Sequence, residues 1–328
     1  MMKIIWMVLF AFALTSIYAP AWAIEIFYPK DMTSFIKSNY LIAFMGEDLD
    51  VDQVNVVING VESGYIDISG ADYRSYFADK LILEPEFDLG ENVILLQGST
   101  ATGEIREARA TVYYLGDDPM ARAPKNFAPF IMHKKEHEQK CGDCHDMNPD
   151  RVALSSISME NNPCASCHRR MLNDSYVHGP AGVFRCVYCH RDSSMSQKYL
   201  VPQEAQLCME CHEEKIGEFK SRKYVHGPVA VGLCLACHDP HASSFPAQLR
   251  SKTNDTCLSC HVTVVKNVHV GRGVGGGAHP LRGVDDPLRR GRELSCASCH
   301  DPHSGEGRSL FIRGEKGRFA LCQHCHQK

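Results

Sequence analysis

The sequence predicts a chain of two dissimilar parts: an N-terminal all-β sandwich, then a C-terminal region of loops and short α-helices. Two observations lead to this prediction. Residues 24–116 contain no cysteine and no histidine, and their apolar residues fall in short alternating runs separated by turn residues. Residues 131–328 contain all 16 cysteines and all 17 histidines of the chain, and the cysteines recur in spaced pairs.

Residues 1–23 have the features of a cleavable export signal. Lys3 precedes an apolar run at 4–14, and the segment ends in Ala21-Trp22-Ala23, with small residues where a signal peptidase needs them. We expect the mature protein to begin at Ile24, with an uncleaved membrane anchor as the alternative. No later apolar run approaches the length of a membrane-spanning helix, so no membrane span is expected after cleavage.

The first part is expected to be a small antiparallel sandwich of about seven strands. The clearest strand patterns cover residues 24–28, 40–44, 54–58, 80–83, 92–97 and 108–115. The separating turn residues are Asn59-Gly60, Ser63-Gly64, Ser69-Gly70, Leu89-Gly90 and Thr102-Gly103. Segment 87–94, followed by Gly103 and a last alternating strand, resembles the end of a bacterial immunoglobulin-like domain, which implies an immunoglobulin-like sandwich at 24–116.

This first part is strongly acidic. Residues 24–130 carry 8 Lys and Arg against 18 Asp and Glu, a balance of −10. Acids such as Asp50 and Asp52 leave calcium binding open beside a solvated acidic loop. No catalytic arrangement is present in the pattern, so we expect a spacer or docking module, joined to the rest of the chain by a proline-containing linker at 117–130.

One pattern, Cys-x-x-Cys-His, organises the rest of the chain and occurs eight times. It is typical of covalent c-type haem attachment: two thiols one turn apart add to the two vinyl groups of one porphyrin, and the adjacent histidine becomes the proximal iron ligand. The expected haem-bound cysteines are Cys141, Cys144, Cys164, Cys167, Cys186, Cys189, Cys208, Cys211, Cys234, Cys237, Cys257, Cys260, Cys296, Cys299, Cys322 and Cys325. The expected proximal ligands are His145, His168, His190, His212, His238, His261, His300 and His326.

Two other uses of the cysteines must be weighed. Sixteen cysteines in an exported chain can form disulfides, and Cys-x-x-Cys pairs also hold zinc. Neither use requires the histidine. If histidine followed the second cysteine by chance, eight occurrences in eight would have a probability on the order of ten to the minus ten. The pattern therefore predicts eight covalently attached haem c groups.

The motifs fall into four doubled units, whose two first cysteines are 22 to 26 residues apart. Residues 176–180 and 224–228 share the sequence Tyr-Val-His-Gly-Pro and lead to Cys186 and Cys234 in the same way. With about 25 residues for each haem, the porphyrin faces must supply much of the buried apolar surface, so the region 131–328 is expected to fold around haem. On these doubled motifs it resembles the multihaem c-type cytochromes, a resemblance that implies electron transfer.

Nine histidines lie outside the proximal positions. His324 lies between the two cysteines of the last motif, where it cannot easily bind that iron. The other eight equal the irons in number and are the candidate distal ligands: His133, His137, His178, His226, His241, His269, His279 and His303. His241 and His303 each follow a proximal histidine by only three residues, so we expect each to bind a neighbouring iron.

The first two units depart from this pattern. They carry Asn148 and Ser193 where the later units carry histidine. One haem there is expected either to lack a protein sixth ligand or to take a methionine, with Met147, Met159 and Met195 as the candidates, although methionine more commonly packs against a ring. Two histidine ligands favour a six-coordinate iron of low potential without room for a substrate.

These features predict an exported octahaem cytochrome that conducts electrons by sequential one-electron transfer between haems in anaerobic respiration, with extracellular acceptors as an extension of this role. The expected partners are other redox proteins, namely periplasmic or outer-membrane cytochromes or a porin conduit, and a homo-oligomer or filament; nucleic acid is not expected. The expected location is the periplasm or the outer membrane and extracellular space. A multihaem reductase of a nitrogen or sulfur oxyanion, with one open haem, is the alternative, and an adhesive or scaffolding protein is a third class.

Overall fold

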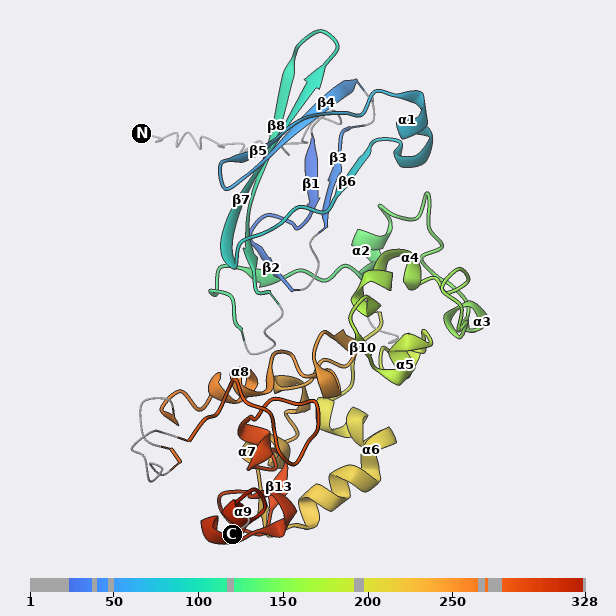
Figure 1. Cartoon of the computed structure of the whole chain (residues 1–328). Helices are drawn as coiled ribbons and strands as arrows, with labels where there is room; N and C mark the ends of the chain where they lie inside the picture. The colour runs from blue at the N-terminus through green and yellow to red at the C-terminus, as the bar shows by residue number, and fades with distance from the viewer. Residues whose placement is uncertain are drawn as a thin grey trace, which may run out of the picture. The chain divides into compact units, whose positions relative to one another are not determined.

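The structure is a computed structural model that describes residues 24–36, 40–46, 50–116, 121–191, 198–264, 269–270 and 279–326. The expected export signal, Ser193 and Met195 lie outside these residues. The chain divides into two compact units, Met1–Phe130 and Ile131–Lys328. Figure 1 shows that the long strands belong to the first unit and that short helices and loops dominate the second.

The described part of the first unit is built from two sheets. The larger has the strand order β5-β4-β7-β8-β2-β9 and the smaller has the order β1-β3-β6. Their bounds are β1 Glu25–Tyr28, β2 Thr33–Phe35, β3 Leu41–Phe44, β4 Val51–Ile58, β5 Val61–Asp67, β6 Lys80–Leu83, β7 Gly90–Thr100, β8 Ile105–Tyr114 and β9 Ala128–Pro129. A short helix, α1 (Ala71–Phe77), lies between β5 and β6 in the sequence.

The core of this unit lies where the inner faces of the two sheets meet. Along β7 every second residue from Asn92 to Thr100 is buried, which is the alternation of a strand with one covered face. A Cβ atom on Gly98 would lie 2.5 Å from Cδ1 of Ile24 and 2.9 Å from Cγ1 of Val51. Glycine at this position therefore lets the segment leading into β1 pack directly on the larger sheet, and the all-β sandwich expected for this region is confirmed.

Several details differ from the sequence expectation. Ser63-Gly64 was expected to be a turn but lies inside β5, where the register shifts and the Ser63 hydroxyl accepts a hydrogen bond from the Val56 N–H at 3.0 Å. The sandwich is not wholly antiparallel, because β2 runs parallel to both β8 and β9. All three β2 residues are buried, so this strand has no alternation that a pattern search would detect.

The end of the expected linker belongs to this unit. Residues 128–129 form β9, which pairs with β2 at the edge of the larger sheet. Phe127 is buried, and the ring of Phe130 makes edge contacts with Phe27 and Tyr28. Aromatic burial therefore holds residues 127–130 against the sandwich.

The second unit consists of short elements joined by loops, as expected. Its α-helices are α2 Lys135–Glu138, α3 Arg151–Leu154, α4 Ala165–His168, α5 Gly179–Gly182, α6 Glu204–Ser221, α7 Gly227–Ala230, α8 Thr253–Leu258 and α9 Arg318–Gln323. Its 3-10 helices are Arg169–Leu172, Cys186–Tyr188, Cys234–Ala236, Pro246–Gln248, Cys296–Ser298 and Ile312–Gly314. The exception in length is α6, which has 18 residues and a kink at His212.

Two small antiparallel sheets repeat the same arrangement in this unit. In one, β10 (Tyr176–Val177) pairs with β12 (Ala242–Ser243), and in the other β11 (Tyr224–Val225) pairs with β13 (Ser304–Gly305). In both cases the strand before one doubled unit pairs with a strand of the next. These pairings connect motifs that are far apart in the sequence.

None of the helices in the described residues combines the length and the apolar composition needed to cross a membrane.

Candidate metal centres

The Cys-x-x-Cys-His motifs share one backbone conformation. In seven of them the histidine N–H donates to the carbonyl of the first cysteine at 2.9–3.0 Å, which closes a single helical turn. The remaining motif, Cys208 to His212, lies within α6. Because one turn separates the two cysteines, both thiols lie toward the same side of the backbone, where one porphyrin can react with both.

All sixteen cysteines are free in the structure, and none forms a disulfide. Each cysteine is at least partly accessible to solvent. The arrangement fits the prediction that the thiols serve as attachment points.

Seven of the eight proximal candidates lie opposite a distal candidate. The ring centroids are 5.8–6.2 Å apart in every case. The pairs are His168 with His133, His190 with His241, His212 with His178, His238 with His303, His261 with His226, His300 with His269, and His326 with His279.

This separation fits an iron atom between two imidazoles. Rings stacked face to face lie closer together, as Phe219 and His303 do at 4.2 Å, so a separation of about 6 Å leaves room for an atom between the two rings. A metal–nitrogen bond is about 2 Å long and the ring centre lies about 1 Å further back, so two axial imidazoles on one iron have centroids about 6 Å apart. The residues present therefore fit the haem that the motifs imply.

The spacing argument on His241 and His303 also agrees with this geometry. Neither lies opposite the proximal histidine three residues before it. His241 faces His190 of the preceding doubled unit, and His303 faces His238 in the same way. The small sheets explain the pairing, because β10 and β12 join His178 to His241 by a 2.9 Å backbone hydrogen bond, and β11 and β13 join His226 to His303 at the same distance.

Hydrogen bonds on Nδ1 orient most of these imidazoles. When Nδ1 binds a fixed acceptor, Nε2 remains available for a metal. Backbone carbonyls accept from His178, His190, His238, His279 and His300 at 2.5–3.2 Å, and the carbonyl of Pro302 accepts from His226. Carboxylates replace the carbonyl at three other distal candidates, with Glu138 beside His133, Asp239 beside His241 and Asp301 beside His303.

Burial keeps several ligand candidates in the neutral form that binds iron. Loss of solvent is the main cause that lowers the pKa of each, with neighbouring histidines as a further cause. The five histidines affected are His168, His190, His226, His238 and His300. An imidazole with a lowered pKa presents a lone pair at neutral pH.

The first motif differs from the other seven. Within the described residues, no histidine ring lies against His145. The remaining distal candidate, His137, has its Nδ1 2.7 Å from the carbonyl oxygen of Ile131, the same kind of contact that orients the other distal candidates.

Other expectations about ligands can also be located. His324 has Nε2 3.1 Å from Glu315 and Nδ1 3.2 Å from Arg313, so both its nitrogens are engaged away from any motif histidine. Asn148 accepts a hydrogen bond from Lys198, and the Met159 side chain is half exposed. In the N-terminal compact unit, Asp50 was a calcium candidate. It forms a bidentate ion pair with Arg106, with distances of 2.8 and 2.6 Å.

Cysteines of successive motifs touch one another. A hydrogen bond between the thiols raises the pKa of Cys164 and lowers that of Cys186 to about 7, and the same bond links Cys257 to Cys296. Burial first, and then the neighbouring Cys234, raises the pKa of Cys208 to about 12. These contacts join the second motif to the third, the fourth to the fifth and the sixth to the seventh.

The second cysteines supply the intervening links. Burial raises the pKa of Cys189, Cys237 and Cys299, and in each case the next cause is a thiol of the following motif. Those thiols are Cys211, Cys260 and Cys325. The attachment sites from the second to the eighth motif therefore follow one another in space in the order of the sequence.

The family comparison agrees with the doubled units. A family described as the doubled CXXCH motif matches residues 178–217, 226–266 and 286–328. Each matched range contains two complete motifs, and the two motifs of the first doubled unit, at 141–145 and 164–168, precede the matched ranges. The comparison therefore identifies the same repeat that the sequence pattern indicated.

Comparison with solved structures gives only partial similarities. A β-glucuronidase of Bacteroides uniformis is 12% identical with a TM-score of 0.19, and the match covers 26% of this chain and 9% of the enzyme. Fibronectin(III)-like modules of CbhA from Clostridium thermocellum are 12% identical, with a TM-score of 0.22 and coverage of 31% and 50%. CopC from Methylosinus trichosporium OB3b is 16% identical, with a TM-score of 0.22 and coverage of 28% and 92%. Comparison with curated protein sequences finds no match.

Proposed function

We propose that the chain is an exported octahaem c-type cytochrome that conducts electrons along its C-terminal unit, which the match of residues 178–328 to the doubled CXXCH motif supports. The observation that carries this proposal is that the thiols of successive motifs are electrostatic neighbours of one another from the second to the eighth motif. Haem iron bound by two histidines supplies one-electron oxidation and reduction without a vacant position. The chain itself fixes the order of the carriers.

The protein contribution to this function is mainly positional. Crossed histidines tie successive doubled units together, since the histidine that follows the first motif of one unit lies opposite the proximal histidine of the first motif of the preceding unit. Hydrogen bonds to backbone carbonyls hold several of the imidazoles, such as those of His178 and His238, at a fixed rotation. Fixed ligands limit reorganisation when an electron arrives, as conduction requires.

We further propose that the protein works with other redox proteins, such as periplasmic or outer-membrane cytochromes or a porin conduit, in anaerobic respiration. The acidic first unit, with a balance of −10, would present a surface for a basic partner. Assembly into a homo-oligomer or filament would extend the series beyond one chain.

The alternative function, a reductase of a nitrogen or sulfur oxyanion, has its best location at the first motif. Among the described residues His145 lies outside the seven histidine pairs, and a reductase needs one iron with an open position. The irons held between the seven histidine pairs would then deliver electrons to this one.

The test combines intact mass, low-temperature electron paramagnetic resonance and carbon monoxide binding on the purified protein. The conduit predicts a mass increase of eight haems, low-spin signals only and no carbon monoxide uptake by the reduced form. One high-spin signal with about one carbon monoxide bound per chain would instead support the reductase. A protein without covalent haem would refute both functions. A Cys141→Ala and Cys144→Ala double variant, expected to carry one haem fewer, checks the count.

A further inference from the structure

Three distal candidates differ from the others in what their Nδ1 atoms face. The Nδ1 of His133 lies 3.1 Å from Oε1 of Glu138, that of His241 lies 3.3 Å from Oδ1 of Asp239, and that of His303 lies 3.4 Å from Oδ1 of Asp301. At His178, His226 and His279 the corresponding acceptor is a backbone carbonyl. These six distal candidates therefore fall into two classes, one with a carboxylate facing Nδ1 and one with a backbone carbonyl facing Nδ1.

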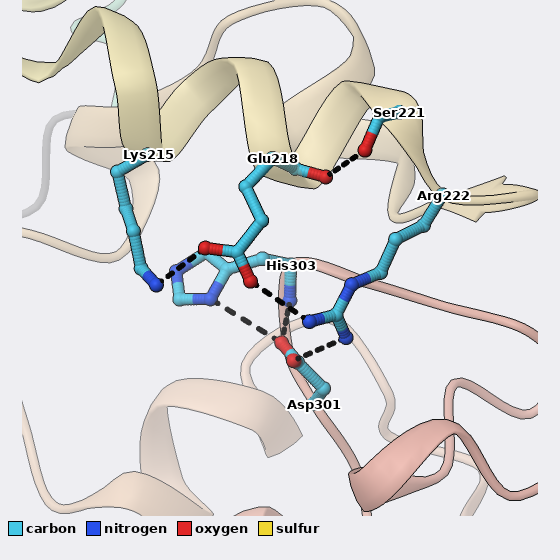
Figure 2. Close-up of polar contacts among 6 residues, drawn as sticks. All are labelled: Lys215, Glu218, Ser221, Arg222, Asp301 and His303. Carbon is cyan, nitrogen blue, oxygen red and sulfur yellow. Dashed lines mark hydrogen bonds and ion pairs between the residues drawn. The ribbon is translucent and has the colours of Figure 1, made fainter.

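Figure 2 shows the arrangement around His303. Asp301 accepts the His303 backbone N–H at 3.0 Å through the same oxygen that faces the imidazole Nδ1. Its other oxygen lies 3.4 Å from Arg222 Nη1, and Arg222 in turn pairs with Glu218 at 2.9 Å. The Phe219 ring stacks on the imidazole at 4.2 Å with an angle of 3° between the planes, which limits its rotation.

The same three-part arrangement occurs twice more. Asp239 holds the backbone N–H of His241 at 3.0 Å and lies 3.6 Å from Arg250. Glu138 faces His133 and lies 2.7 Å from Lys198. Both carboxylate side chains are only 6% exposed, whereas that of Asp301 is 25% exposed. The Nδ1 atom of His241 is buried and makes no regular hydrogen bond, so Asp239 acts on this imidazole through its charge.

The repeat of histidine, carboxylate and cation has a direct electrostatic consequence. A carboxylate on Nδ1 makes the imidazole a stronger electron donor and adds negative charge near the metal. Both effects favour the ferric over the ferrous state. Addition of an electron to that iron is then less favourable than at an iron whose ligand faces a carbonyl.

We propose that Glu138, Asp239 and Asp301 are positioning residues that lower the reduction potentials of the irons held at His168, His190 and His238, so that the series contains three low-potential carriers. This inference rests on the proposed function, since it requires iron between the paired histidines. The three sites belong to the second, third and fifth motifs. Electrons in a partly reduced protein then reside mainly on the other carriers.

Removing a carboxylate and removing the cation that pairs with it should shift the reduction potential of the nearby iron in opposite directions. Arg222 offsets the charge of Asp301, so its removal leaves that carboxylate less neutralised beside the ligand. Asp301→Asn should shift one component of the redox titration to more positive potential, by roughly tenfold or more in the equilibrium constant for reduction. Arg222→Gln should shift the same component to more negative potential.

The experiment is a spectroelectrochemical titration of the full-length haem-loaded protein and its variants. Glu218→Gln is the matched control, because it removes an acidic group that contacts Arg222 from the same cluster but does not face His303. It should produce a much smaller shift. Asp239→Asn, at an independent site, should move a different component in the positive direction.

Haem content and electron paramagnetic resonance distinguish a failure of the tuning role from a failure of the conduit function. Variants with eight haems and unchanged low-spin signals but unshifted titrations would overturn the tuning role and leave the conduit intact. If Asp301→Asn gives a high-spin iron, the carboxylate only holds the ligand in place, and tuning is again refuted. If Asp301→Asn does not fold, Arg222→Gln and Asp239→Asn must still shift in opposite directions. A wild-type protein without haem would refute the proposed function itself.

Discussion

At the scale of single residues, the second nitrogen of each histidine decides what the ring can bind. Distal candidates such as His178 and His226 have Nδ1 on a backbone carbonyl, whereas both nitrogens of His324 are engaged by Arg313 and Glu315. A carbonyl acceptor fixes the tautomer with the proton on Nδ1 and leaves Nε2 for a metal. Distal ligands can thus be distinguished from a histidine with another role by their hydrogen bonds.

We expect His226→Ala to open the iron bound at His261. The two rings are 6.0 Å apart, so alanine removes the nitrogen that faces His261 across the iron site. The variant should gain one high-spin signal and bind about one additional carbon monoxide per chain in the reduced state. His324→Gln is the control and should change neither quantity. Wild-type spectra from His226→Ala would show that this histidine is not the ligand.

Asp286 is a buried acid with a structural role that depends on pH. It is only 3% exposed, and its carboxylate receives hydrogen bonds from Arg289, Ser298 and the Leu288 N–H at 2.6–2.9 Å. Burial alone would raise its pKa, but these hydrogen bonds outweigh that effect, so the pKa is lowered. A lowered folded-state pKa means that its stabilisation is present above the unfolded value of about 3.9 and is lost as the pH falls through the folded value.

Asp286→Asn should therefore lower the free energy of unfolding by about 1–3 kcal/mol at pH 7. The difference from the wild type should shrink as the pH falls below about 4, because the wild-type acid is then protonated as well. Denaturant unfolding at several pH values measures both effects. Asp255→Asn, which removes an exposed ion pair with Arg282, is the control and should cost less than about 1 kcal/mol. A pH-independent difference would contradict the assignment.

The sequence alone locates the candidate ligands but not their partners. Every cysteine and histidine of the candidate centres can be found from the Cys-x-x-Cys-His repeat and from counting the remaining histidines. The pairing of His303 with His238, however, depends on how β11 meets β13, where Tyr224 pairs with Gly305, 81 residues later in the sequence. Glu138 was missed as a neighbour of His133, although the Asp-Pro-His spacing is a signal that could have revealed Asp239 and Asp301.

At the scale of elements, the two small sheets and α6 hold neighbouring doubled units together. Each sheet pairs the segment before one motif with the segment after the first motif of the following unit. Helix α6 contributes a ligand candidate at its kink, His212, and the aromatic ring of Phe219 against His303. The two-residue strands of the small sheets are too short to be stable alone, so haem and the neighbouring units must hold them.

The fold of the first unit was easier to predict where strands alternate. The pattern at 92–97 lies inside β7, but fully buried β2 and bulged β5 were not expected as strands. Helix α1 was missed as well. This helix has no buried residue, so its sequence lacks the apolar stripe by which an amphipathic helix is predicted.

Gly305 in β13 tests the importance of these sheets. A Cβ atom there would lie 2.9 Å from Cα of Leu310, which is backbone and cannot move aside easily. Gly305→Ala should destabilise the second unit by about 1–3 kcal/mol and displace His303, with a high-spin signal as the readout. Gly217→Ala in α6 is the control, since a Cβ atom there meets nothing within 4 Å and alanine favours a helix. Equal stability of both variants would contradict a close-packed β13.

At the scale of the whole chain, the two compact units differ in the residues that they carry. The first is an acidic sandwich without cysteine or histidine, and the second holds the attachment sites in sequence order from the second to the eighth motif. A series of carriers differs from a branched cluster in one measurable respect. An electron crossing a series must pass every internal position, so internal and terminal sites are not equivalent.

We therefore expect the loss of an internal haem to reduce conduction more than the loss of a terminal one. Cys208→Ala with Cys211→Ala removes the fourth attachment site, and Cys322→Ala with Cys325→Ala removes the eighth, so both proteins would carry seven haems. Currents through films of the two proteins between electrodes, at equal haem content, provide the comparison. The internal variant should carry much less current, because the gap lies between carriers on both sides. Equal currents would mean that electrons bypass the fourth site, and the carriers would then form a branched network instead of a single series.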